Sequence, residues 1–218
     1  MERLKFRLDI LKEISVEDML GCMKHGEAPE GGEVLGLKRK VYEQVVRYLR
    51  IEGNPTEADP DYKEANINHL VFSIISPILE QVALTTRENV RLQSQKEIVS
   101  TDGKTGGTQE VVVVDRITYN KEKFILVVES KRSSLGQALK QCLLALKDMR
   151  DNNGDGKVYG FLTTGTLWQM VEYDGRSFRL TEKMIALFGG MDEDEARWMR
   201  KHSTIVDCLK FALDNGDR

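Results

Sequence analysis

Residues 124 to 131 read Phe-Ile-Leu-Val-Val-Glu-Ser-Lys, an apolar run that leads directly into charged side chains. Five consecutive apolar residues are typical of a strand at the centre of a sheet, where both faces are covered. Glu129 and Lys131 end this strand, and buried charges require a partner, a metal ion or a ligand. Because successive side chains of a strand alternate between its faces, these two lie on the same face. The sequence therefore predicts a functional site at the end of a central strand.

A second strand is predicted immediately before this one. Residues 110 to 115 read Glu-Val-Val-Val-Val-Asp, and the polar residues 119 to 123 are typical of a hairpin turn. A turn centred near Glu122 would place Asp115 across from Glu129, with their side chains about 5 Å apart. Two carboxylates at that distance repel each other unless they share a proton or a divalent cation. We therefore expect Asp115 and Glu129 to form a site that holds either a shared proton or a divalent cation. A carboxylate that only caps a turn is the alternative for Asp115.

The order of these residues resembles the core motif of the PD-(D/E)XK nuclease superfamily. The motif takes the form of Asp115, thirteen intervening residues and Glu129-Ser130-Lys131, with Val114 in place of the usual proline. The resemblance covers residues 62 to 181. It is nearest to nuclease domains of type I restriction subunits and to restriction-like domains of some eukaryotic effector proteins.

Two flanking helices strengthen the resemblance. The predicted helix that begins near Glu64 is similar to the family's first core helix, whose acidic residue faces the metal site. The predicted helix from Leu135 to Arg150 is similar to the helix after the family's E-x-K strand. On that helix Gln137 and Gln141 are candidates for a polar active-site residue, and Gln141 is favoured. The ordinary alternatives are an acid at a helix N-terminus for Glu64 and a solvated helix face for the glutamines.

The resemblance also implies a fold and a reaction. The fold would be an α/β, restriction-endonuclease-like core with a mixed central sheet flanked by helices. The reaction would be hydrolysis of phosphodiester bonds in DNA, with RNA less favoured, by an enzyme that uses Mg²⁺ or Mn²⁺. The resemblance implies metal binding by Asp115, Glu129, the backbone carbonyl of Ser130 and Glu64, with Lys131 and Gln141 as further catalytic residues. The alternative is a catalytically inactive copy that binds nucleic acid or another protein.

The overall charge does not by itself favour binding to nucleic acid. The formal net charge is -3 at pH 7, so the chain as a whole does not attract phosphates. Basic side chains near the predicted site can still create a local positive field. The candidates for nucleic-acid contact are Arg116, Arg132, Lys140 and Lys147. Solvated charges on an exposed surface are the alternative.

The chain divides into three predicted parts, which are a helical region at 1–60, the core at 61–185 and a C-terminal helix within 186–218. Helices are expected over 34–49 and 62–84, with Pro77 kinking or breaking the second, and Ser15 is expected to cap a short earlier helix. Further strands are expected over 87–99, 158–163 and 167–173, and in a last strand that ends near Thr181.

The expected setting is intracellular, either cytoplasmic or nuclear. No segment is expected to be long or apolar enough to span a membrane, and the N-terminus lacks the apolar core of a secretion signal. Three widely spaced cysteines, an odd number, argue against a disulfide framework. Nucleic acid is the expected partner, no membrane contact is expected, and a homodimer or larger assembly remains open.

Overall fold

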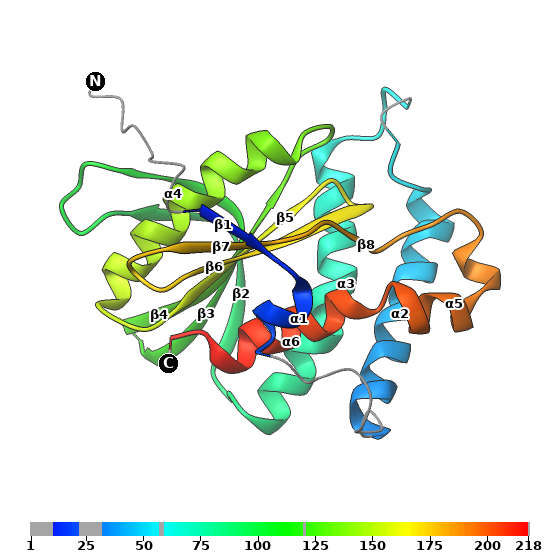
Figure 1. Cartoon of the computed structure of the whole chain (residues 1–218), viewed down its shortest axis with the longest axis horizontal. Helices are drawn as coiled ribbons and strands as arrows, with labels where there is room; N and C mark the ends of the chain where they lie inside the picture. Colours follow the sequence, from blue (N-terminus) through cyan, green and yellow to red (C-terminus); the bar gives the residue numbers. More distant parts are fainter. Residues whose placement is uncertain (1–10, 22–31, 57–58, 120, 218) are drawn as a thin grey trace.

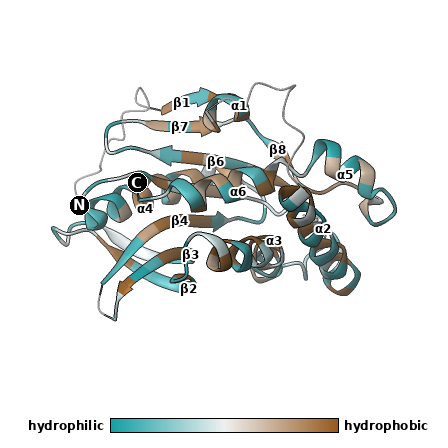
Figure 2. Ribbon diagram, turned by 90° about the horizontal axis from the view of Figure 1, so that it is seen from below, coloured by the Kyte–Doolittle hydropathy of each residue, from teal (hydrophilic) through white to brown (hydrophobic). Residues whose placement is uncertain are grey.

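The computed structural model describes residues 11–21, 32–56, 59–119 and 121–217. In this part of the chain, eight strands form one mixed sheet, and helices cover both of its faces (Figures 1 and 2). The predicted fold class, an α/β protein with a mixed central sheet flanked by helices, is confirmed.

The predicted apolar strand that leads into Glu129 and Lys131 lies inside the sheet. The strand order is β1, β7, β6, β5, β4, β3, β2, and β8 pairs with β6. The strands are β1 (Leu11–Ile14), β2 (Val90–Val99), β3 (Gly106–Thr118), β4 (Lys121–Ser130), β5 (Val158–Thr163), β6 (Leu167–Tyr173), β7 (Phe178–Thr181) and β8 (Met184–Ile185). Strands β2, β3 and β4 are antiparallel, whereas β4 and β5 are parallel and are joined by the crossover helix α4 (Leu135–Asn153). The central position predicted for β4 is therefore confirmed.

Both faces of β3 and β4 are buried, which explains their unbroken apolar runs. Residues 111 to 114 of β3 are all valine, and they alternate between two apolar layers. One layer contains α3 (Glu64–Thr85) and α6 (Thr204–Asn215), and the other contains α4. A side chain at the end of β4 therefore lies near either α3 or α4.

The predicted register of the β3–β4 hairpin is wrong. Thr118 pairs with Lys121, so only two residues separate the strands, and the turn lies before Glu122 instead of being centred on it. Asp115 consequently pairs with Lys123 and not with Glu129. The polar residues of 121–123 belong to the strand because they find partners there: Glu122 forms an ion pair with Lys96 of β2 and accepts a hydrogen bond from Gln93.

The described N-terminal residues, 11–21 and 32–56, do not form the separate helical region predicted from the sequence. β1 joins the sheet beside β7, in parallel register. After it, α2 (Gly32–Glu52) lies beside α3 and shares its apolar layer (Figures 1 and 2). Between β1 and α2, the predicted cap at Ser15 is confirmed. Its hydroxyl accepts a 3.0 Å hydrogen bond from the backbone N–H of Asp18 in α1 (Val16–Met19).

Of the two effects expected at Pro77, a kink or a break, the break does not occur, because helix α3 continues through this residue. One expectation about the other helices needs correction. The expected C-terminal helix is divided into a 3-10 turn (Met191–Glu193), α5 (Glu195–Lys201) and α6. The last of these packs against α3 and β4.

One helix in the described part of the chain, α3, is long and apolar enough to cross a membrane, with 22 residues and a mean hydropathy of 1.4. The expectation that no segment has these properties is therefore wrong. The finding is weak evidence for a membrane span, because the core helix of a soluble protein has the same composition. In the structure, α3 packs against α2, α6 and the sheet.

Gly160 in β5 leaves room for α4 to approach the sheet. A Cβ atom built at this position would lie 2.2 Å from Sγ of Cys142 and 3.2 Å from Cδ1 of Leu146. We expect Gly160→Ala to lower the free energy of unfolding by about 1–3 kcal/mol, as overpacking of a core does. Urea denaturation measures this loss. Gly189→Ala is the control, since no atom lies within 4 Å of its added Cβ, and equal stability of the two variants would contradict the prediction.

Candidate active site

The carboxyl group of Glu129 is buried at the end of β4 without a full set of partners. Its side chain is 2% exposed, and Oε1 has no hydrogen-bond partner. The pKa of Glu129 is raised to about 7, first by burial and then by the neighbouring Glu110 and Glu64, while Lys131 opposes this shift. Glu129 therefore lies in a negatively charged and poorly hydrated environment, which favours either a proton or a bound cation.

Glu110, not Asp115, is the acidic neighbour of Glu129 on β3. Val111 pairs with Val128, so the next residue of each antiparallel strand brings Glu110 beside Glu129. Glu110 accepts a hydrogen bond from the hydroxyl of Ser130, and its Oε1 lies 3.5 Å from Nζ of Lys131. The pair of strand carboxylates predicted from the sequence is present, but β3 supplies a different residue.

Lys131 joins the two strands to α3. Its Nζ lies 3.5 Å from Oε2 of Glu64 and 3.5 Å from Oε1 of Glu110. Glu64 is the first residue of α3, where the partial positive charge of the helix end favours an acid. The structure thus brings together the predicted residues Glu64, Glu129 and Lys131.

Two further side chains complete this group. Ser130 is fully buried, and its Oγ lies 2.8 Å from Oδ1 of Asn68 on α3. Asn68 follows Glu64 by four residues, which is about one helical turn, so both lie on the same side of the helix. We refer to Glu64, Asn68, Glu110, Glu129, Ser130 and Lys131 as the carboxylate cluster.

Sequence reasoning missed Glu110 and Asn68. A two-residue turn at positions 119 and 120 would have placed Glu110 opposite Glu129, and the asparagine at 120 is a common turn residue. For Asn68, the available signal was its spacing of one turn from Glu64.

Asp115 lies at the other end of β3 and has a structural environment. It forms an ion pair with Arg87, at 3.5 Å. Arg87 in turn donates hydrogen bonds to the backbone carbonyls of Asp214 and Gly216, where α6 ends. The predicted pairing of Asp115 with Glu129 is therefore wrong, because Asp115 helps to hold the C-terminal end of α6 instead.

The structure does not bring Gln141 into the carboxylate cluster. Gln137 and Gln141 both lie on the exposed side of α4. The α4 residue that interacts electrostatically with Glu129 is Cys142, which is fully buried.

The predicted nucleic-acid contacts are scattered over the fold. Arg132 follows Lys131 and donates a hydrogen bond to the carbonyl of Asp59. Arg116 is exposed near the hairpin end of β3, beside Asp115 and away from Glu110. On α4, Lys140 is exposed, whereas Lys147 forms a 2.7 Å ion pair with Asp151. Their contact with nucleic acid stays a prediction.

The donors of the carboxylate cluster suit Mg²⁺ or Mn²⁺. Within the residues that the structure describes, no three acidic, histidine or cysteine side chains lie close enough, as they stand, to hold an ion. The ammonium group of Lys131 lies between two of the three carboxylates. Glu64, Glu110 and Glu129 nevertheless offer hard oxygen ligands, and Oε1 of Glu129 is buried without a partner. We conclude that the residues fit a divalent cation by their chemistry.

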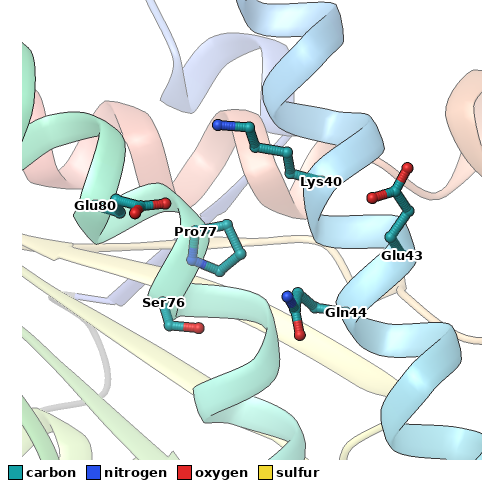
Figure 3. Close-up of a pocket in the computed structure, with 6 residues that line it drawn as sticks. All are labelled: Lys40, Glu43, Gln44, Ser76, Pro77 and Glu80. Atoms are coloured by element: carbon teal, nitrogen blue, oxygen red, sulfur yellow. The ribbon is translucent and has the colours of Figure 1, made fainter.

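A separate depression of about 370 Å³ lies between α2 and α3 (Figure 3). Its lining residues are Lys40, Glu43, Gln44, Ser76, Pro77 and Glu80. None of them belongs to the carboxylate cluster.

No protein-family model matches the chain, and no curated protein matches it at a significant level. The geometry and chemistry of the carboxylate cluster are therefore the basis for assigning a function.

Proposed function

We propose that this protein is a metal-dependent nuclease that hydrolyses phosphodiester bonds, in DNA before RNA. The observation that carries the proposal is the buried carboxyl group of Glu129, whose Oε1 has no partner and whose neighbours are Glu110 and Lys131. A purely structural role does not account for this arrangement, because burying an acid beside a second acid is unfavourable.

In this proposal the residues of the carboxylate cluster have distinct roles. Glu110, Glu129, Glu64 and the backbone carbonyl of Ser130 would hold Mg²⁺ or Mn²⁺. When bound, the metal supplies a more acidic water and neutralises charge on the scissile phosphate. Lys131 uses its ammonium group, now held near two carboxylates, to stabilise negative charge that develops on the phosphate.

The order of elements supports the resemblance to the PD-(D/E)XK superfamily. Helix α3 is followed by three antiparallel strands, the helix α4 and the parallel strand β5, as we expect for a restriction-endonuclease-like core. With Glu110 in the place first given to Asp115, the motif reads Glu110, eighteen residues, and Glu129-Ser130-Lys131.

The proposal includes an intracellular setting, cytoplasmic or nuclear, where nucleic acid is the substrate. The buried cysteines Cys142 and Cys208 are free thiols, which suits a reducing compartment.

Cleavage of labelled single- and double-stranded DNA and RNA tests the proposal. We expect cutting with Mn²⁺ or Mg²⁺ and none with EDTA. Lys131→Met keeps the length of the side chain but removes its charge, and we expect it to lower the cleavage rate about a hundredfold. Metal-independent binding of nucleic acid without cleavage would contradict the proposal and favour the inactive binding module.

A further inference from the structure

Glu110 is held from the α3 side by a chain of hydrogen-bonding groups. Ser130 is fully buried, and its Oγ contacts both Oε2 of Glu110 and Oδ1 of Asn68. The neighbouring Glu129 interacts instead with Cys142 of α4. The two strand carboxylates thus differ in their surroundings, because Glu110 is hydrogen-bonded to Ser130 whereas Oε1 of Glu129 has no partner.

The number of hydrogens fixes the direction of this chain. A serine hydroxyl has one hydrogen, so Ser130 donates to only one of the two oxygens that it contacts. An ionised carboxylate is the stronger acceptor, so the hydrogen goes to Glu110. Ser130 then accepts a hydrogen bond from Asn68, so the amide of Asn68 must present its N–H₂ group to Ser130. The carbonyl and amino ends of an asparagine are assigned from such hydrogen-bond networks. With Glu110 ionised and the amide of Asn68 assigned in this way, the order of donation is Asn68 to Ser130 to Glu110.

In this arrangement the two oxygens of the Glu110 carboxylate have different contacts. Oε2 is held by Ser130, while Oε1 points toward Lys131, 3.5 Å away. A carboxylate fixed in this way does not lose rotational freedom when its second oxygen binds a cation. Metal-binding side chains commonly depend on such hydrogen-bonding partners.

We propose that Asn68 and Ser130 are positioning residues that orient Glu110 for metal binding. The inference rests on the proposed function, and it assigns these two side chains a role in metal affinity and not only in folding. It also explains why a fully buried serine separates Glu129 from Lys131: its side chain supports the acid of the neighbouring strand.

Equilibrium Mn²⁺ binding to the full chain tests this inference. We expect Ser130→Ala and Asn68→Ala each to weaken Mn²⁺ affinity about tenfold to a hundredfold. Because both act through the same carboxylate, the double variant should bind little more weakly than either single variant, and neither change should matter further in a Glu110→Gln background. Ser73→Ala is the matched control, since its hydroxyl donates to the backbone of His69 on the same helix.

Asn68→Asp tests the direction of donation. An aspartate has nearly the same shape but cannot donate, and its added negative charge alone would strengthen cation binding. Because the lost donor no longer orients Ser130 and Glu110, we expect weaker Mn²⁺ binding in spite of the added charge. Affinity equal to or above that of the wild type would overturn the inference.

The remaining outcomes separate this inference from the proposed function. Wild-type Mn²⁺ binding that Ser130→Ala and Asn68→Ala leave unchanged would overturn the positioning role alone. Additive losses that persist in the Glu110→Gln background would also overturn it. A wild-type protein that binds no Mn²⁺ would overturn both proposals.

Discussion

Glu110→Gln is expected to lower metal-dependent cleavage about a hundredfold or more, whereas Asp115→Asn is expected to leave it nearly unchanged. A metal-bound site stabilises transition-state charge by several kcal/mol, and a loss of about 3 kcal/mol corresponds to about a hundredfold in rate. Glu110 lies beside Glu129 and Lys131, whereas Asp115 is paired with Arg87 at the other end of β3. Initial rates on a labelled DNA substrate measure the difference.

The two substitutions form a matched pair, because each replaces a carboxylate of β3 by its amide. Thermal denaturation should show that both variants are folded. Cleavage that survives Glu110→Gln but is lost in Asp115→Asn would restore the pairing predicted from the sequence and contradict the site described by the structure.

Glu129→Gln is expected to abolish Mn²⁺ binding. It is also expected to gain stability relative to the wild type as the pH rises. The pKa of Glu129 is raised from 4.5 to about 7, so in this window the folded protein retains a proton that the unfolded chain has lost. The free energy of unfolding therefore falls as the pH rises from about 4.5 to about 7. Since one pKa unit corresponds to about 1.4 kcal/mol, the total effect is about 3 kcal/mol.

Urea denaturation without metal at pH 5 and pH 8 measures this effect. The stability of Glu129→Gln relative to the wild type should improve by about 2–3 kcal/mol between the two pH values, because at pH 5 part of the effect is already present. A difference that does not depend on pH would contradict the raised pKa. Glu122→Gln is the control, because Glu122 is ion-paired with Lys96 away from the carboxylate cluster.

The strands whose two faces are both buried could be predicted from the sequence. The apolar run of β4 indicated its central position, and the predicted limits of β5 and β6 agree with the structure. β1 was missed because it has only four residues, two of them exposed, and its pairing with β7 involves residues far away in the chain. A strand this short carries no periodic signal.

The candidate site was only partly predictable because register depends on the turn. The four valines of 111–114 look the same to a sequence pattern, so they do not specify which residue of β3 lies opposite Glu129. The charged residues at 121–123 suggested a loop, but Glu122 is paired across the strands with Lys96. Contacts such as that of Asn68 with Ser130 join residues 62 positions apart, and local patterns do not report them.

Mn²⁺ binding at pH 8, measured in the presence of a short DNA duplex, shows whether the carboxylate cluster is a metal site. The wild type and Asp115→Asn should bind Mn²⁺ with similar affinity, while Glu110→Gln should bind it much more weakly and Glu129→Gln should not bind it. No Mn²⁺ binding by the wild type, or wild-type affinity in both glutamine variants, would contradict the assignment of a metal site to the carboxylate cluster.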